Sequence, residues 1–367
     1  MKNDELFYYL ALQAVDGIGP VTAKKLVDHF GDVKSIFDEK QHKKRKIKGF
    51  GSGLFKGLNK REIFEKAERE LLYLEDQELH AVCFSDRDYP SKLKHCQDAP
   101  IVLFQKGKFN INQKKVISIV GTRLMTSYGS RFLKEFIREA KIYDPIIVSG
   151  LAYGIDICAH QESLRNDICT VGILAHGLDR IYPKSHTGTV QKMITNGGLY
   201  TEFWSGTVAD PVNFVKRNRI IAGISEATLV VESAHKGGSL ITAQLASSYH
   251  RDVLAVPGRT TDRFSQGCNM LIKSNKAALV TSFKDLEYAL GWTSEPSVKK
   301  PVQKKLFVEL DEQERRLYNL LEGSGKKLLD ELALESGFGV QKTLMLLLQL
   351  ELKGIVLGHS GKRFQAI

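Results

Sequence analysis

The sequence predicts an α/β protein whose central part is a doubly wound, mostly parallel sheet. Three observations predict this fold class: the middle of the chain alternates short β-rich runs with helical segments, both flanks carry helical patterns, and a stretch rich in proline and lysine precedes the last flank. Strands that alternate with helices form parallel sheets covered on both faces. The expected boundaries are 1–75 for a helical domain, 76–292 for the sheet domain, 293–306 for a linker and 307–367 for a small last domain.

The composition fits a protein with a substantial core and a polyanionic partner. The chain has 367 residues, of which 43% are hydrophobic and 26% are charged, and its formal net charge is +11. A strongly positive charge favours polyanions and carries no information about the fold. Nucleic acid is therefore the first partner to test.

Targeting and metal-binding signals are missing from the sequence. The first residues lack the basic-then-apolar order of a signal peptide, and no apolar run approaches the roughly 20 residues of a membrane span. The five cysteines are scattered, without the spacing of metal ligands. We therefore expect a cytoplasmic protein with reduced cysteines, no membrane partner and no bound metal.

The N-terminal region carries two glycine turns, each followed by a helix-like stretch. The first contains Gly17 and Gly19, and the second contains Gly49 and Gly51 next to a basic run at 43–46. Glycines permit a tight hairpin, and the free N–H groups at the next helix start can face a phosphate oxygen. This pattern predicts a helix-hairpin-helix (SAM-like) domain. Two alternatives stay open: helix corners without a ligand, and a basic run that is only a solvated surface.

Five short apolar runs predict the strands of the sheet domain. They lie at 116–120, 145–148, 170–174, 228–231 and 253–256, with helical segments between them. In a doubly wound, Rossmann-like sheet, ligands bind at the carboxyl ends of the strands. The residues that follow these runs are small and polar, so the sequence predicts a binding crevice at that edge.

The stretch 210–223 predicts a helix with a ligand-binding face. Its N-cap would be Asp210, and Phe214, Arg217 and Asn218 fall on one face together with Ile221. An aromatic ring beside a guanidinium can stack an unpaired base and hold its phosphate. The alternative assigns the apolar residues to the core and the arginines to structural ion pairs.

The stretch 236–243 predicts a phosphate cradle. Lys236, Gly237, Gly238 and Ser239 lead from a strand into a helix, whose free N–H groups and dipole attract an anion. The spacing matches neither a Walker A motif nor G-x-G-x-x-G. Arg123, just past the first predicted strand, would add a positive charge to the same crevice.

Three titratable residues near these segments do not form a catalytic set. Asp156, His160 and Glu232 have no nucleophile, metal set or matched carboxylate beside them in the sequence. We interpret them as structural or orienting residues. The sequence therefore predicts a binding protein that is not an enzyme, with no catalytic residue and no cofactor.

The C-terminal region predicts a winged helix. Helical patterns at 312–322, 327–335 and 340–353 are followed by a hairpin-like segment at 355–364. The preceding stretch carries two prolines and several lysines with little apolar content, which is typical of a solvated linker.

A series of motifs is more specific than any one of them. In chain order they lie at 118–123, 149–156, 177–183, 214–223, 238–243 and 256–258, with 88–90 and 98–103 upstream. The combination resembles the DprA/Smf family of DNA-processing proteins over most of the chain. One departure is that the family usually has Ser-Gly-Ser where this chain has Gly237-Gly238-Ser239, which removes a hydroxyl and leaves the backbone N–H groups.

The resemblance implies a homodimer that binds single-stranded DNA, protects incoming DNA during natural transformation and helps to load the recombinase RecA. The strand-binding residues that it implies are Arg123, Phe214, Arg217, Asn218, Arg219 and the loop 237–239. The terminal domains vary within the family, so their roles transfer poorly.

Two other functions remain open at this point. Related folds include enzymes that hydrolyse the base from a nucleoside monophosphate, but the loop at 236–243 lacks the glutamate that their phosphate-loop motif carries. The third possibility is a duplex-DNA or scaffold protein whose central domain binds only a small nucleotide.

Overall fold

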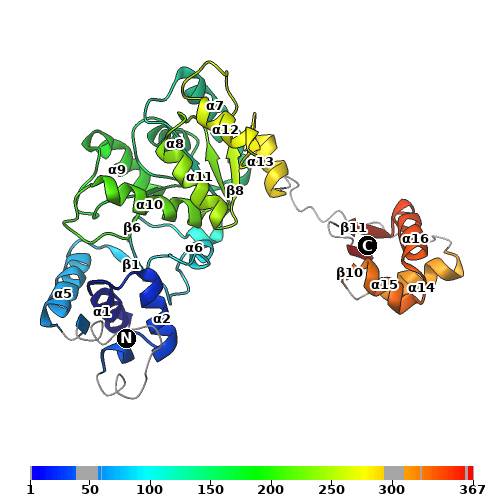
Figure 1. The fold of residues 1–367 in the computed structure, drawn as a ribbon, viewed down its shortest axis with the longest axis horizontal. Coiled ribbons are helices and arrows are strands. Elements are labelled where there is room, and N and C mark those ends of the chain that lie inside the picture. The colour runs from blue at the N-terminus through cyan, green and yellow to red at the C-terminus, as the bar shows by residue number, and fades with distance from the viewer. Residues whose placement is uncertain are drawn as a thin grey trace. The chain divides into compact units, whose positions relative to one another are not determined.

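The computed structural model describes residues 2–38, 57–58, 60–292, 310–322, 325–359 and 363–366. The second glycine turn with Gly49 and Gly51, the basic run at 43–46 and the expected linker at 293–306 lie outside these residues. The chain divides into two compact units, residues 1–294 and 295–367, and each is described by itself (Figure 1).

A mixed sheet of nine strands organises the described part of the first unit. Its spatial order is β1-β2-β6-β5-β4-β3-β7-β8-β9. The seven strands from β6 to β9 in this order are parallel, whereas β1 and β2 are antiparallel to their neighbours. The strands are β1 His80–Cys83, β2 Val102–Lys106, β3 Val116–Val120, β4 Ile146–Ser149, β5 Thr170–Ile173, β6 Gly197–Thr201, β7 Ala227–Val230, β8 Asp252–Ala255 and β9 Ala278–Leu279.

The prediction of a doubly wound, mostly parallel sheet is confirmed. All five expected strands are present as β3, β4, β5, β7 and β8, each within one or two residues of the expected bounds. From β3 the chain proceeds through β4, β5 and β6 on one side, and β7 to β9 lie on the other side of β3. The strand order therefore reverses between β3 and β7.

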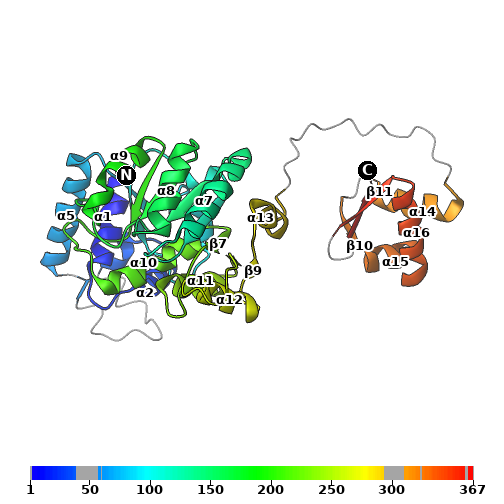
Figure 2. The same ribbon diagram turned by 90° about the horizontal axis from the view of Figure 1, so that it is seen from above.

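Helices cover both faces of the sheet (Figure 2). Ile117 and Ile119 of β3 face a cluster that contains Phe136 of α7, whereas Val116 and Val120 face a cluster that contains residues of α10 and α11. This alternation follows from the period of two along a strand. The helices of this part are α6 Ser91–Lys94, α7 Ser127–Ala140, α8 Ile155–Arg165, α9 Thr187–Thr195, α10 Pro211–Ile224, α11 Gly238–Ser248, α12 Gln266–Lys273 and α13 Phe283–Leu290.

The N-terminal helices share a hydrophobic cluster with the sheet. They are α1 Lys2–Gln13, α2 Pro20–Phe30 and α5 Arg61–Asp76, with a 3-10 turn at Lys34–Phe37. Leu10 of α1 and Leu26 of α2 belong to the same buried cluster as Phe104 of β2 and Leu199 of β6. A domain boundary at residue 75 stays a prediction, because both sides of it lie in one compact unit.

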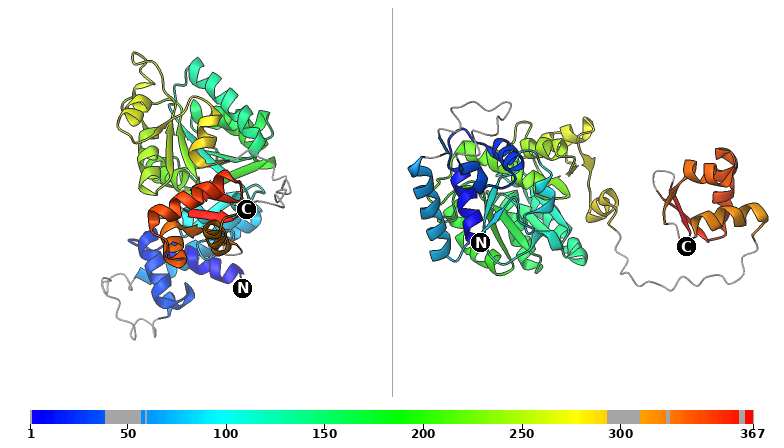
Figure 3. Two further views of the ribbon diagram at one scale, coloured as in Figure 1. Left: turned by 90° about the vertical axis from the view of Figure 1, so that its right-hand side faces the viewer. Right: turned by 90° about the horizontal axis from the view of Figure 1, so that it is seen from below.

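The second unit is a winged helix, as expected (Figure 3). Leu317, Leu332, Leu347 and Phe364 belong to its buried cluster. No helix in the described residues of either unit is long and apolar enough to cross a membrane. The elements of this unit are α14 Glu312–Leu321, β10 Lys327–Leu328, α15 Leu329–Ser336, α16 Val340–Leu352, β11 Val356–His359 and β12 Arg363–Ala366.

Candidate functional site

A cavity of about 610 Å³ opens at the carboxyl edge of the sheet, where the strand order reverses between β3 and β7. This is the position at which open α/β sheets bind their ligands. We call it the charged crevice. Its lining includes charged, aromatic and loop residues: Arg123, Asp156, Tyr182, Phe214, Arg217, Asn218, Lys236, Gly237, Gly238, Ser239, Arg263 and Phe264.

The ring of Phe214 lies close to two guanidinium groups. The central carbon of the Arg123 guanidinium is 5.5 Å from the ring centroid, and that of Arg217 is 5.7 Å from it. The ring of Tyr182, which is half exposed, lies 6.0 Å away. Phe214 itself is half-buried, so the crevice offers an aromatic surface with positive charge beside it.

Arg217 lies at the base of the crevice and is 3% exposed. Its Nη1 donates to the carbonyl oxygens of Gly150 and Ile173, and its Nε donates to Asn218 Oδ1 at 3.2 Å. Burial lowers the pKa of Arg217 to about 10, while the Asp156 carboxylate acts in the opposite direction. Arg217 therefore stays protonated at neutral pH.

Asp156 is the counter-charge in this buried part of the site. Burial raises the pKa of Asp156, and the charge of Arg217 opposes that shift. Its Oδ2 also accepts a hydrogen bond from the backbone N–H of Ala152 at 3.3 Å. The pair lies around Gly150, where an added Cβ would come within 2.7 Å of both side chains. A glycine at 150 is thus what leaves room for Arg217 and Asp156.

Arg123 reaches the crevice from the loop after β3 and is exposed. Two backbone bonds hold this loop: Thr122 N donates to Glu232 O, and Ile155 N donates to Thr122 O. Gly154, with a φ of +76°, packs so closely that an added Cβ would lie 2.3 Å from Thr122 O. The backbone around Arg123 is therefore fixed, while its side chain is free to meet a ligand.

The loop before α11 brings Lys236, Gly237 and Gly238 to the crevice. Gly237 is the N-cap of α11 and supplies no side-chain cap, so the first N–H groups of the helix face outward. Ser239 is buried, and its hydroxyl donates to Ser233 Oγ at 2.9 Å. This loop thus offers an anion its backbone N–H groups and the exposed Lys236, whereas the Ser239 hydroxyl is already engaged.

The Ser233 hydroxyl occupies the space next to Gly237. A Cβ added at Gly237 would lie 2.6 Å from Ser233 Oγ. A serine side chain at 237 would therefore crowd the hydroxyl of Ser233, which also lines the crevice.

Arg219 is not part of the charged crevice, in contrast to the other residues expected around it. Its guanidinium donates to the Asp98 carbonyl and pairs with the Glu202 carboxylate. Two positions after Arg217, a helix turns by about 200°, which carries Arg219 to another side of α10. Arg219 is thus engaged within the protein and is not among the crevice-lining residues, and its expected contact with a DNA strand stays a prediction.

Three lining residues with aromatic or charged side chains were not predicted from the sequence. Arg263 is exposed and Phe264 half-buried in the segment between β8 and α12, and Tyr182 lies after β5. The available signal was the rule that the carboxyl ends of neighbouring parallel strands share one edge. Applied to the whole loop after β8, that rule would have included Arg263 and Phe264.

The first glycine turn lies between α1 and α2, away from the residues of the crevice. Gly17 has a φ of +82°, and Gly19 is the N-cap of α2 with Pro20 as the next residue. A Cβ added at either glycine would meet no atom within 4 Å. The turn is open to solvent on that side, and a phosphate contact there stays a prediction.

The other titratable residues expected to be structural are engaged within the protein. Glu232 accepts hydrogen bonds from the N–H and the hydroxyl of Thr126. His160 Nδ1 lies 2.7 Å from Thr170 Oγ1, and burial lowers the pKa of His160 to about 3. Both contacts hold helices against the sheet.

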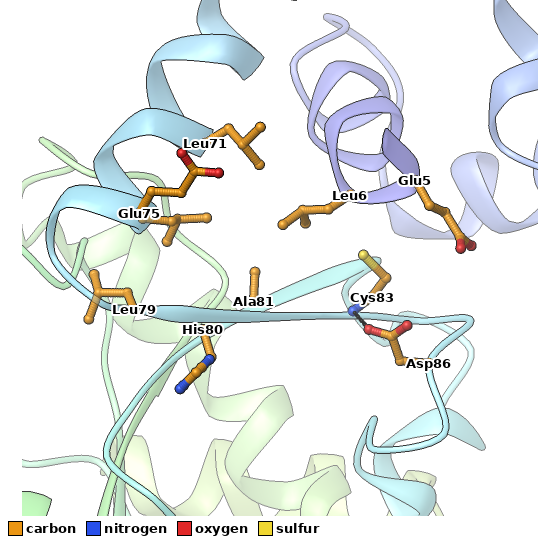
Figure 4. Close-up of a pocket in the computed structure, with 10 residues that line it drawn as sticks. Glu5, Leu6, Leu71, Glu75, Leu79, His80, Ala81, Cys83 and Asp86 are labelled. Carbon is orange, nitrogen blue, oxygen red and sulfur yellow. Dashed lines mark hydrogen bonds between the residues drawn. The ribbon is translucent and has the colours of Figure 1, made fainter. Parts of the chain in front are cut away.

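A second cavity, of about 190 Å³, lies between α1, α5 and β1 (Figure 4). Leu6, Leu71 and Ala81 face it, whereas His80 points to the other side of the strand. Its charged lining includes Glu75 and Asp86. Carboxylates repel a polyanion, so the charged crevice is the better candidate for one.

The fold and this crevice define a Rossmann-like protein with a C-terminal winged helix and a site suited to an anionic, aromatic ligand. The family model described as DNA recombination-mediator protein A matches residues 80–291, and the DprA winged helix domain matches residues 306–362. The chain belongs to the DprA/Smf family of DNA-processing proteins.

Relatives and solved structures agree with this assignment. The chain is 33% identical to Protein Smf of Synechocystis over 79% of its own length and 74% of the relative, and 32% identical to Protein Smf of Escherichia coli over 80% and 79%. The DprA structure from Streptococcus pneumoniae matches with a TM-score of 0.58 and 28% identity, covering 74% of this chain and 98% of that one.

A second solved structure bears on the ligand of the family. DprA from Helicobacter pylori matches with a TM-score of 0.53 and 25% identity, covering 58% of this chain and 95% of that one. That structure is described as giving insight into the single-stranded DNA binding mode of the Helicobacter protein.

Proposed function

We propose that the charged crevice binds single-stranded DNA. The observation that carries this proposal is the ring of Phe214 close to the guanidinium groups of both Arg123 and Arg217, in a cavity of about 610 Å³. An aromatic face beside positive charge suits an unpaired base and its phosphate together. The single-stranded DNA bound by the Helicobacter relative supports the same ligand class.

The residues divide into three roles in this proposal. Arg123, Lys236 and Arg263 are exposed and contact phosphates, together with the N–H groups at Gly237 and Gly238. Phe214 and Tyr182 stack on bases. Arg217, whose Nε donates to Asn218 Oδ1, lies beside the Phe214 ring and fixes a positive charge at the base of the crevice.

The geometry favours a single strand over a duplex. The aromatic rings lie within a crevice and not on a convex surface, and a base can stack on Phe214 only when its own stacking neighbours are gone. In a duplex each base face is covered by the next base pair. A small nucleotide would use the same ring, so the preference for polymers rests on the exposed cations at the rim.

The test is binding of a labelled oligonucleotide, single-stranded against blunt duplex, across a range of salt concentrations. We expect tighter binding of the single strand and a slope of log K against log salt of about −0.7 for each phosphate neutralised. Equal affinity for the duplex would overturn the proposal. Binding of a nucleoside monophosphate with release of its base would favour the enzyme alternative.

We further propose that the protein acts in the cytoplasm as a homodimer that protects incoming DNA during natural transformation and helps to load RecA. Membership of the DprA/Smf family supports this role. The assay is RecA ATPase on single-stranded DNA pre-coated with single-strand-binding protein. Acceleration by this protein that is lost in an Arg123→Ala variant would support loading through the crevice. If the RecA ATPase is not accelerated although this protein binds the strand tightly, the RecA-loading part of the proposal is wrong and only strand protection remains.

A further inference from the structure

Helix α16 of the winged helix carries an apolar stripe on its outer face. Val340, Leu344, Leu348 and Leu352 follow one another at intervals of four residues, and Met345 lies beside them. These five side chains are between 38% and 89% exposed. The opposite face of α16 holds the buried Thr343, Leu346, Leu347 and Leu350, so the helix is apolar on two sides.

The other helices of the same unit do not show this pattern. The exposed residues of α14 are all polar: Glu312, Gln313, Arg315, Arg316 and Asn319. In α15, Leu334 is exposed next to three acidic residues. The stripe is therefore a property of α16 and not of the unit's surface in general.

The stripe does not fit a nucleic-acid ligand. In a winged helix, α16 holds the position of the helix that enters the major groove in DNA-binding members of this fold class. Base edges and phosphates require donors, acceptors and positive charge. The exposed residues of α16 are the five apolar ones, two glutamines (Gln341 and Gln349) and a single charged residue, Lys342, so the stripe itself offers no donor or charge.

The charge of the unit points to self-association. Residues 310–367 contain eight Asp and Glu and eight Lys and Arg, so the net charge of +11 lies entirely in residues 1–309. A neutral unit has no electrostatic repulsion that would keep two copies apart, and a net charge near zero promotes association. It also lacks the positive charge that would draw it to a polyanion.

The size and symmetry of the stripe also fit a second copy. The five side chains expose on the order of 500 Å², which is in the range of the largest apolar patch on a typical monomer, a patch that is often functional, and is a substantial share of the roughly 800 Å² per partner in a standard interface. A two-fold interface uses the same patch on both subunits. A four-residue repeat along the whole of α16 lets apolar side chains meet their copies in either helix orientation.

We propose that the outer face of α16 is an interface between two copies of this chain. Its occupant is the α16 stripe of a second winged helix, independent of any contact that the sheet unit makes with another copy. In a DNA-bound assembly, such pairing joins proteins that sit on the same strand or on different strands.

The test is disulfide cross-linking of the full-length chain through single cysteines on the stripe. Leu344→Cys, Leu348→Cys and an equal mixture of the two are oxidised mildly; the five native cysteines are all buried. A parallel pair of helices gives cross-links within each variant, and an antiparallel pair gives them in the mixture. Gln313→Cys on the polar face of α14 is the matched control.

We expect a cross-linked dimer from the stripe variants and none from Gln313→Cys. Adding Leu352→Glu should abolish the cross-link and raise the dissociation constant of this contact in sedimentation by about tenfold or more, without lowering the melting temperature, because Leu352 is 89% exposed. Stripe variants that cross-link no more than the control would overturn the proposal. That result would mean that another protein, or residues 1–294 of the same chain, covers the face.

Discussion

Phe214 and Arg217 lie one turn apart on α10, yet the ring is open to the crevice while the guanidinium is buried against the carbonyl of Gly150. The distance from the guanidinium carbon to the ring centroid is 5.7 Å. A positive charge is thus held beside the aromatic ring by the protein's own carbonyl groups. The two residues share a helix face, but replacing Arg217 should lower stability, whereas replacing Phe214 should weaken ligand binding.

Arg217→Ala should destabilise the protein. The change removes donors from two buried carbonyl groups and leaves Asp156 without its counter-charge, which costs about 3 kcal/mol or more. Thermal and urea unfolding measure the loss. A variant with an unchanged melting temperature, but with a salt slope of binding reduced by one contact, would show that Arg217 contacts phosphate directly.

Arg123→Ala should weaken single-strand binding without affecting stability, because its side chain is exposed. We expect the salt slope to become less steep by about 0.7, the value of one phosphate contact. Arg138→Ala, an exposed arginine late on α7, is the matched control and should change neither quantity. An equal loss of affinity in both variants would indicate a general charge effect.

Phe214→Ala should remove roughly 1–3 kcal/mol of binding free energy and leave the salt slope unchanged, because stacking neutralises no phosphate. Phe214→Tyr keeps an aromatic ring and should retain most of the affinity. The measurement is the same oligonucleotide titration, recorded beside a thermal melt. A loss of folding in Phe214→Ala would instead assign the ring to the core.

Gly150→Ala should disturb the base of the crevice. The added methyl group would lie 2.7 Å from the Arg217 guanidinium and from Asp156, and overpacking of this kind costs about 1–3 kcal/mol. Gly188→Ala on α9 meets no atom within 4 Å and should be neutral or slightly stabilising. Comparable unfolding curves for the two variants would contradict the crowding inferred at Gly150.

Stability should fall as the pH drops below about 6.5, in part because of His160. Thr170 Oγ1 donates to Ile147 O, so it accepts from His160 Nδ1, and Nε2 has no partner for a second proton. Burial lowers the folded-state pKa to about 3, so between about 6.5 and 3 only the unfolded chain takes up this proton. The contribution of the neutral His160 ring to the free energy of unfolding is therefore complete well above pH 6.5, and it is lost progressively as the pH falls below that value.

The expected size of this effect is about 2 kcal/mol between pH 7 and pH 5. His160→Asn can keep a donor near the position of Nδ1 and does not titrate, so its stability should depend less on pH by that amount. Urea unfolding at several pH values measures it. The same pH dependence in both proteins would show that other groups, such as His176, whose pKa burial also lowers, account for the loss.

The sequence was sufficient for the five inner strands of the parallel part of the sheet but not for β6 and β9, the two strands at the ends of that part. β3, β4, β5, β7 and β8 are apolar runs bounded by turn residues, which is the pattern of buried parallel strands. β6 begins with Gly197-Gly198, and β9 has two residues, so neither carries that pattern. These strands form because neighbouring strands offer free backbone groups, which a local pattern does not reveal.

The sequence predicted which site residues share a helix face, because those residues are close together in the chain. It did not predict which of them are exposed to a ligand, because that depends on burial by distant residues. The helix N-cap at Asp210 and the shared face of Phe214 and Arg217 follow from helix periodicity. Whether an arginine on that helix faces a ligand or a carbonyl depends on partners such as Glu202 and Gly150, which lie far away in the sequence. Periodicity separates the face of Arg217 from that of Arg219, but it could not show that Arg217 is buried against backbone carbonyl groups.

A gene fusion after codon 294 keeps the first compact unit whole, whereas one near codon 75 divides a hydrophobic cluster. Leu10 and Leu26 cover the same cluster as Phe104 and Leu199, so a chain that starts after α5 would expose apolar surface of β2 and β6 to water. Fluorescent tags or exchanged C-terminal modules therefore belong at the later point. Natural recombination between genes of this family faces the same restriction: the winged helix can be exchanged as a cassette, but the N-terminal helices must be inherited together with the sheet that they cover.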